Sequence, residues 1–509
     1  MPDGGAPDET LMQACRRRFG ITKSVEEVME DAENAPNKLK RSLNVLDITA
    51  IGIGAIIGAG IFVLTGVAAA LRAGPAIIIS FIISGIACSL AALCYAEFAS
   101  MLPISGSAYT YSYATLGELV AWIIGWDLIL EYAVGSIAVA VGWGGYLVEL
   151  LGAAGIQVPV AISGSPLAVE GAIINLPAMT IVLLLTAMLL VGTKESARIN
   201  LALVMVKLVV IIVVIVVGMS YIDSKNYEPF MPFGITGVFG GAAIVFFAYI
   251  GFDAASTTAE EAKNPQRDLP IGIISALVIS TALYIAAAAV ITGMVPYSQL
   301  NQSAPFAYAF SQHQVVWATA IVSVGAIAGI TSVLLVGLLA QPRIFFSLSR
   351  DGLLPPGISK VHPRFKTPYI STLITGIAVA ICAGILPIGI AAELTNIGTL
   401  FAFFLVSVGI IVLRKSRPDL HRPFKVPLVP WLPAIGAGFC LLLMFSLPAI
   451  TWFRFLGWLG IGLIIYANYG YHHSKVNKRR EALTASEAGN GESEVVEVSE
   501  PVVEIVEAD

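Results

Sequence analysis

Gly52-Ile53-Gly54-Ala55-Ile56-Ile57-Gly58-Ala59-Gly60-Ile61-Phe62 lies inside the first long apolar run of the chain. Its four glycines within nine residues weaken a helix, because each costs roughly 0.5–1 kcal/mol relative to alanine. Lipid offers no partner to a freed backbone group, so a break at this depth must face protein or a water-filled cavity. The stretch therefore predicts an interrupted membrane helix. The alternative is that the glycines only let neighbouring helices pack closely.

A broken membrane helix can bind a small ligand through its main chain. It presents N–H groups and a positive dipole end to an anion, and carbonyl groups to a cation. A small zwitterion carries both charges. We therefore interpret the stretch as half of a substrate site.

Composition places the chain among polytopic membrane proteins. Of its 509 residues, 57% are hydrophobic and only 12% are charged, and the mean hydropathy is +0.84. Soluble domains carry about 25% charged residues. The five cysteines show no metal-ligand spacing and lie mostly in apolar runs, so we expect neither a metal nor another cofactor.

Twelve apolar runs are long enough to span about 30 Å of hydrocarbon. We place them near residues 46–70, 75–101, 117–151, 174–192, 196–219, 236–259, 269–293, 314–349, 369–387, 390–413, 427–447 and 449–471. The remaining segments are a polar arm (1–44) before the transmembrane domain (45–473), and a tail (474–509) that is basic and then acidic. We expect the tail to be disordered, because it lacks aromatic residues.

Basic residues predict the orientation of the chain. With twelve spans and the N-terminus in the cytoplasm, 25 of the 29 lysines and arginines lie on the cytoplasmic side. Only Arg72, Lys225 and Arg454 lie outside, and Lys207 lies within the membrane. This bias follows the positive-inside rule. We therefore expect a multi-pass protein of the cell membrane with both termini in the cytoplasm.

A second interruption lies in the sixth span, at Ile250-Gly251-Phe252. Paired interruptions at corresponding positions in two halves are typical of transporter binding sites. Spans one to five (about 46–219) and six to ten (about 236–413) would form two inverted halves, followed by two further helices (427–471). The aromatic residues around Gly251 suit a gate over a polar ligand, although they are also typical of lipid-facing or core packing.

Four ionisable residues lie within the spans, where a charge costs at least about 2.5–3.5 kcal/mol. They are Asp127 and Glu131, which share a helix face, together with Lys207 and Asp253. Lys207 lies roughly 15 Å from the Arg198 end of its span, at 1.5 Å per residue. Its amine could snorkel toward the cytoplasm along its aliphatic stem. We favour a buried amine that gains and loses a proton, because burial disfavours the charged form.

Together these motifs resemble the cationic amino acid transporter family of the amino acid–polyamine–organocation superfamily. The resemblance covers about residues 40–470. It rests on the glycine break and on four further motifs, which are FAYIGFD (247–253), NPQRDLP (264–270), SRDGLLP (349–355) and LTNIGTL (394–400). It implies an all-α fold of the LeuT type, a five-plus-five inverted repeat with two C-terminal helices, in which helices 1 and 6 are discontinuous. The bacterial members with a lysine like Lys207 are proton-coupled.

The resemblance also implies roles for individual residues. The substrate α-carboxylate would sit on backbone N–H groups around Gly58, Ala59 and Gly60. The α-amine would meet backbone carbonyls near Ile56 and at Phe247, Ala248 and Ile250. Phe247 would be the aromatic gate, and Ile330 would close the side-chain pocket. The complete substrate-binding set is Ile56, Ile57, Gly58, Ala59, Gly60, Glu131, Phe247, Ala248, Tyr249, Ile250, Asp253 and Ile330, with Lys207 and Glu131 in proton coupling.

We therefore expect a secondary active transporter that takes up amino acids with protons by alternating access. Its partners are the substrate, protons and the lipid bilayer. The substrate preference is expected to be neutral or broad, although Glu131 could attract a cationic side chain. We also expect Gly60→Val to block binding in a protein that still folds, since a side chain there would keep the carboxylate away.

Two alternatives remain open. The chain could exchange one amino acid for another, with Lys207 as a structural strut, or it could be a membrane-embedded amino acid sensor. Persistent counterflow that ignores an uncoupler would favour exchange, and tight binding without flux would favour a sensor. We do not expect an enzyme, because the sequence offers no nucleophile–base pair, metal cluster or phosphate loop. Nucleic-acid binding is not expected either, since the basic residues are scattered among loops.

Overall fold

The computed structural model describes residues 43–101, 107–191, 196–253, 262–358, 360, 362 and 367–478. Within these ranges the chain forms helices and no β-strand. Most of the expected arm (1–42) and of the expected tail (479–509) lies outside the described residues. The expectation of an all-α polytopic membrane protein is confirmed for the part of the chain that is described.

The first half of the chain contains two short stretches of π-helix and one of 3₁₀-helix among its α-helices. Its elements are α3 (Val45–Ile56), η1 (Gly60–Leu64), α4 (Thr65–Ala68), η2 (Ala69–Ala73), η3 (Gly74–Ala76), α5 (Ile77–Met101), α6 (Ser107–Thr115), α7 (Glu118–Ala153), α8 (Val160–Ser163), α9 (Leu176–Val191) and α10 (Ser196–Gly218).

Short 3₁₀ turns and one stretch of π-helix, η9, lie among the longer helices of the second half. Its elements are η4 (Met219–Tyr221), η5 (Ser224–Tyr227), α11 (Gly234–Val245), η6 (Phe246–Tyr249), α12 (Pro265–Met294), η8 (Tyr297–Gln299), α13 (Pro305–Gln312), α14 (Val316–Arg350), α15 (Tyr369–Ile385), α16 (Ile388–Ser416), α17 (Trp431–Phe445), α18 (Ala449–Ile465), η9 (Tyr466–Gly470) and α19 (Tyr471–His473).

Many of these helices are apolar enough for a membrane. Seven continuous helical stretches have the length and hydropathy of a span, and five further apolar helices are shorter. Each of the twelve expected spans overlaps at least one helix of the structure. Two of the short helices, α3 and α11, are short because the first and sixth expected spans are interrupted.

The first interruption follows directly from the glycine stretch. Helix α3 starts with a capping box, in which the Asn44 side chain accepts from the N–H groups of Leu46 and Asp47, and such caps fix where a helix begins. It ends at Ile56, because Ile57 is extended (φ −77°, ψ 107°). Helical geometry resumes as η1 at Gly60.

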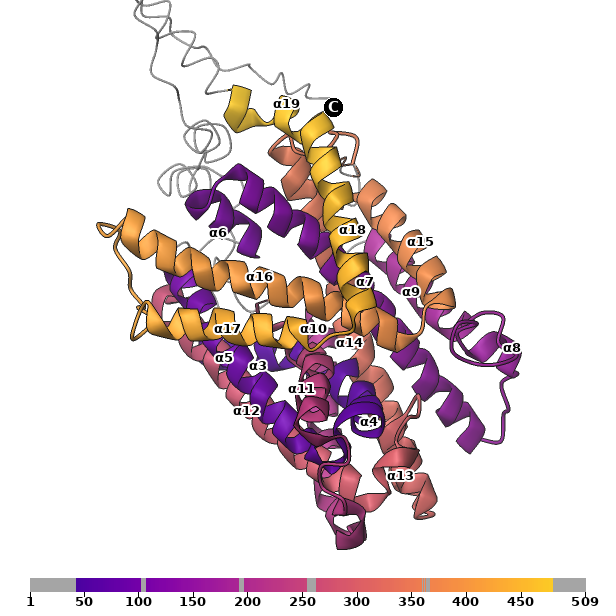
Figure 1. The fold of residues 1–509 in the computed structure, drawn as a ribbon. Coiled ribbons are helices and arrows are strands. Elements are labelled where there is room, and N and C mark those ends of the chain that lie inside the picture. The colour runs from indigo at the N-terminus through magenta and orange to yellow at the C-terminus, as the bar shows by residue number, and fades with distance from the viewer. Residues whose placement is uncertain are drawn as a thin grey trace, which may run out of the picture.

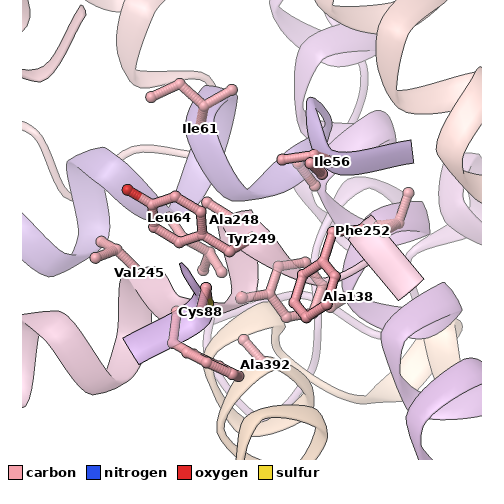
Figure 2. Packing of buried hydrophobic residues seen from close by; sticks show 14 of the residues in the cluster. Ile56, Ile61, Leu64, Cys88, Ala138, Val245, Ala248, Tyr249, Phe252 and Ala392 are labelled. Carbon is pink, nitrogen blue, oxygen red and sulfur yellow. The ribbon is translucent and has the colours of Figure 1, made fainter. Parts of the chain in front are cut away.

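The breaks lie in the middle of the bundle. Helix α14 packs against α7, and α12 packs against both α5 and α3, while α16 and α17 run alongside each other (Figure 1). Ile56 beside the first break and Ala248, Tyr249 and Phe252 around the second belong to one buried cluster (Figure 2). The long helices therefore enclose both interruptions.

A polar cluster at one end of the bundle fastens the end of the described chain. The buried carboxylate of Glu118 accepts hydrogen bonds from Tyr113, Tyr466, Ser474 and Asn477. Residues 474–478, which we expected to belong to the tail, are thus bonded to the start of α7.

Candidate functional site

The first break leaves main-chain donors without partners. Among the hydrogen bonds of the described residues, none has the N–H group of Gly58, Ala59 or Gly60 as its donor. A buried N–H group without a partner is costly and rare in native proteins. All three residues line one internal pocket. Three adjacent donors facing a cavity can bind an anionic group such as a carboxylate.

The second break approaches the first one closely. Gly251 has φ +113°, a conformation that side chains rarely adopt. A Cβ atom at Gly251 would lie 2.8 Å from the carbonyl oxygen of Ala55, and one at Gly60 would lie 2.3 Å from the Cα atom of Ala248. The two glycines therefore let the interrupted helices touch. Gly60→Val would have to shift one of them, so its effect on binding includes a change in this contact; that the variant keeps its fold stays a prediction.

The pocket between the breaks is small. Its volume is about 80 Å³, and a water-sized group needs roughly 10–15 Å³. Besides both breaks, α7, α14 and α16 form its walls. Its lining residues are Ala55, Ile56, Gly58, Ala59, Gly60, Glu131, Tyr132, Gly135, Ser136, Val139, Phe247, Ile250, Gly251, Asp253, Val333, Val336, Gly337 and Thr395.

The lining combines acidic and apolar residues. Glu131 on α7 and Asp253 after the second break are both nearly fully buried, and the Tyr132 hydroxyl donates to Asp253 at 3.5 Å. Val139, Val333 and Val336 supply an apolar wall. The pocket can therefore hold a polar head group and a short apolar side chain together.

Lys207 on α10 is fully buried behind the first break. Its Nζ donates to the carbonyl oxygens of Gly54 and of Ile57, the latter at 2.8 Å, and lies 3.5 Å from the Ser332 hydroxyl. No ion pair of Lys207 occurs within the described ranges. The amine thus ties α10 to the carbonyls of the break through neutral partners, which agrees with a buried position and excludes snorkelling.

Comparison with known proteins identifies the family. The amino acid permease family matches residues 43–466. The chain belongs to the amino acid permease family. The permease is 51% identical to the methylthioribose transporter of Bacillus subtilis (strain 168), over 88% of this chain and 97% of the relative.

Two further relatives represent two kinds of amino acid transporter. The branched-chain amino acid permease BcaP of Bacillus subtilis (strain 168) is 49% identical over 90% of this chain and 98% of its own length. The vacuolar cationic amino acid transporter 4 of Arabidopsis thaliana is 40% identical over 78% of this chain and 67% of its own length. The resemblance to cationic amino acid transporters is therefore confirmed, and these relatives are transporters and permeases, not enzymes.

Most of the expected site residues of the permease meet at the pocket. The expected residues that line it are Ile56, Gly58, Ala59, Gly60, Glu131, Phe247, Ile250 and Asp253. Phe247, the expected gate, is buried there with 7% of its surface exposed. Both breaks therefore contribute to one pocket, as the sequence predicts.

Other expected residues lie next to the pocket without lining it. Ile57 offers its carbonyl to Lys207, and the Tyr249 hydroxyl donates to Phe81 on α5 at 2.8 Å. Ala248 contacts Gly60 through its backbone. Ile330 is buried, but α14 reaches the pocket with Val333, Val336 and Gly337, one to two turns further along.

Asp127 stays outside the pocket. It is fully buried, and neither carboxyl oxygen has a hydrogen-bond partner within the described residues. A Cβ atom at Gly398 on α16 would lie 2.6 Å from Oδ1 of Asp127, so this glycine makes room for the carboxyl group. The contacts do not connect Asp127 to a ligand.

Sequence reasoning missed Tyr284 on α12. Its hydroxyl lies 3.0 Å from the carbonyl oxygen of Ile56 and 2.8 Å from that of Ala248. One buried hydroxyl therefore joins the two interrupted helices. It also occupies two of the carbonyls expected to meet the substrate amine, so that a ligand must compete with it or use their second lone pairs.

Tyr284→Phe is expected to destabilise the permease by about 1–3 kcal/mol, because the two buried carbonyls lose the one O–H donor that they share. It should also weaken substrate binding, since the two breaks would no longer be held together. Thermal unfolding and substrate titration measure the two effects. Tyr227→Phe is a matched control, because the Tyr227 hydroxyl donates to Ala289 at 2.7 Å away from the pocket. Equal affinity for the substrate in both variants would contradict the bridging role.

Proposed function

We propose that this permease is a secondary active transporter that carries amino acids into the cytoplasm by alternating access. The observation that carries the proposal is the row of three unpartnered N–H groups at Gly58, Ala59 and Gly60 in the wall of a small buried pocket. A substrate carboxylate would accept from these groups. The amine would bind on the other side, near Ile250 and the carboxylates of Glu131 and Asp253.

The proposal includes the LeuT type of fold. Twelve spans would comprise two inverted halves (about 46–219 and 236–413) and two final helices (427–471). The positions of the two breaks, one near the start of each half, support this arrangement. The positive-inside bias supports a cell-membrane protein with its arm (1–44) and its tail in the cytoplasm.

We assign proton coupling to Lys207. As an ammonium it donates to Gly54 and Ile57 and stiffens the break that binds the carboxylate. No carboxylate pairs with it within the described residues. The ammonium is therefore not held in its charged form by an ion pair, and it can release its proton when the site opens to the cytoplasm. Uptake requires that the protonated form binds substrate more tightly, because only differential affinity shifts a conformational equilibrium.

The size and walls of the pocket favour small neutral substrates. A cavity of about 80 Å³ holds on the order of five to eight non-hydrogen atoms at 10–15 Å³ each. Alanine and valine suit this volume and the valine-lined wall better than arginine does. The name of the relative BcaP, a branched-chain amino acid permease, agrees with this preference.

Methylthioribose is the second candidate substrate. The most similar of the three relatives compared above transports it. The apolar wall could hold its methylthio group, and the buried hydroxyl of Ser136, which has no partner among the described residues, could bind one of its hydroxyl groups. The sugar has neither a carboxylate nor an amine, however. It would leave the three N–H groups at the first break with weaker, neutral acceptors.

Uptake into proteoliposomes tests both candidates. Labelled alanine, valine, arginine and methylthioribose would be supplied with and without an inward proton gradient. We expect accumulation of alanine and valine that an uncoupler abolishes. Counterflow that ignores the uncoupler would instead indicate exchange, and binding without flux would indicate a sensor. Transport of methylthioribose alone would overturn the proposal.

Gly337→Val should narrow the substrate range. Gly337 lines the pocket opposite Ser136, whose hydroxyl would lie 2.7 Å from a Cβ atom at this position. The added carbons fill the side-chain end of the cavity, so valine uptake should fall by about 10- to 200-fold, with a smaller effect on alanine. Gly438→Val on α17 is the control, because a Cβ atom there meets nothing within 4 Å. An equal loss for both substrates would contradict the assignment.

A further inference from the structure

A second cavity lies away from the substrate pocket, where η2, α11 and α17 meet. Its volume is about 540 Å³. Residues from the outer parts of both interrupted spans line it, together with the end of α17, and they include Arg72, Phe233, Thr236, Leu442 and Phe445. The substrate site makes no use of this cavity.

The cavity is unusual in its combination of an exposed cation and exposed apolar side chains. Leu71, Phe233, Leu442 and Phe445 expose 53%, 42%, 40% and 72% of their surfaces. Large contiguous apolar surfaces of this kind mark interaction sites. Beside them the side chain of Arg72 is exposed and has no ion pair or hydrogen bond within the part of the chain that the structure describes.

The backbone of α11 positions Arg72 over this cavity. A Cβ atom at Gly240 would lie 3.6 Å from Cδ of Arg72, and one at Gly237 would lie 2.3 Å from its carbonyl oxygen. The two glycines therefore let the end of η2 lie directly on α11. The aliphatic stem of Arg72 covers Gly240, and Arg72 lines the cavity.

We propose that this cavity binds an anionic phospholipid of the outer leaflet, with the phosphate on Arg72 and an acyl chain along Leu442 and Phe445. Arginine binds phosphate through two parallel hydrogen bonds. Because Arg72 lies at the end of an apolar span, its side chain is at the level of lipid headgroups. A soluble anion would satisfy the guanidinium but would leave the apolar side chains in water. A neutral lipid would cover those side chains but leave the cation unpaired.

The bound lipid would also influence the movement of the outer parts of the two interrupted spans during transport, a consequence that rests on the proposed function. In alternating access the outer parts of spans one and six move relative to the rest of the bundle. The cavity joins these two parts to α17, which lies outside both proposed halves. A lipid held there stabilises whichever conformation keeps η2, α11 and α17 together, and its loss shifts that equilibrium.

Native mass spectrometry of the full-length protein tests the lipid site. The protein would be purified from nanodiscs of phosphatidylglycerol or of phosphatidylcholine, and retained lipid counted during stepwise delipidation. We expect the wild type to retain one phosphatidylglycerol tightly. Arg72→Gln should bind this lipid at least about tenfold more weakly. Arg454→Gln on α18, another basic residue of the expected outer side, is the matched control. Equal retention by wild type and Arg72→Gln, or equal retention of the two lipids, overturns the proposal.

Two further measurements test whether the site binds a whole lipid or only a phosphate group. Inorganic phosphate at millimolar concentration should not displace the lipid; displacement would mean that the apolar wall contributes nothing and would overturn the lipid assignment. Phe445→Ala should release the lipid while leaving Arg72 in place. Because both readouts measure binding and not transport, they stand or fall separately from the proposed function. The effect of phosphatidylglycerol on alanine uptake then tests the gating consequence alone.

Discussion

Proteoliposomes that contain the Lys207→Met variant are expected to equilibrate alanine across the membrane without accumulating it. One pH unit across the membrane is worth about 1.4 kcal/mol per proton, which drives about tenfold accumulation for one proton per substrate. Methionine keeps a flexible apolar stem of similar length, but it cannot donate to Gly54 or Ile57 and carries no exchangeable proton. The wild type should therefore accumulate alanine about tenfold, whereas the inside-to-outside ratio of alanine for the variant should stay near one.

The control for this experiment is Lys225→Met. Lys225 lies in η5 and is not buried, and its replacement should leave accumulation unchanged. Thermal unfolding must show that Lys207→Met is folded, because losing bonds to a charged donor destabilises by about 1.5–3 kcal/mol each. Wild-type accumulation by a folded Lys207→Met would eliminate Lys207 as the coupling group and leave it as a structural strut.

Substrate titration at several pH values gives the same assignment an independent test. If the ammonium form of Lys207 stabilises the carboxylate site, alanine binds the wild type more weakly as the pH rises and the amine loses its proton. The affinity of Lys207→Met should be independent of pH over the same range. A pH dependence retained by the variant would move the coupling proton to another group, of which Glu131 and Asp253 are closest to the pocket.

Both helix breaks could be predicted from the sequence because the environment leaves few alternatives. Four glycines in one apolar run, and Gly251 among aromatic residues in another, cannot be explained by turns at the surface of a soluble protein. A lone lysine about 15 Å into a span favours protein partners over snorkelling, and Lys207 has such partners at Gly54 and Ile57. Features that cost much free energy in lipid, such as helix breaks and buried charges, can therefore be predicted from the sequence alone.

The rotation of helices about their axes could not be predicted in the same way. Ile330 and Val333 are one turn apart on α14, yet only the second lines the pocket. Tyr284 lies in an ordinary apolar helix, and nothing in its neighbourhood shows that its hydroxyl reaches one carbonyl from each of the two interrupted helices. These facts depend on which helices pack together, and a single sequence does not contain that information.

Gly60 shows that a glycine identified from the sequence can have a second structural reason. The sequence argument assigned its missing side chain to the approach of a ligand. The structure assigns it in the first place to the approach of Ala248, 2.3 Å from where a Cβ atom would be. A glycine required for contact between two backbones looks the same in a sequence as one required for contact with a ligand.

Gly251→Ala is expected to destabilise the permease by about 2–6 kcal/mol and to abolish transport, because it combines two costs. A non-glycine residue at φ +113° is strained by about 1–3 kcal/mol. The new Cβ atom would also lie 2.8 Å from the carbonyl oxygen of Ala55 and 3.0 Å from its carbon, and overpacking of this kind costs about 1–3 kcal/mol.

The clash at Gly251 cannot be relieved by rotating a side chain, since both Ala55 atoms belong to the backbone of α3. The first break must move instead, and with it the N–H groups of Gly58 to Gly60 that we assign to the carboxylate. Thermal unfolding and alanine titration would be compared with Gly457→Ala on α18, where a Cβ atom meets nothing within 4 Å. If Gly251→Ala bound alanine like the control, the contact between the two breaks would not hold the site together.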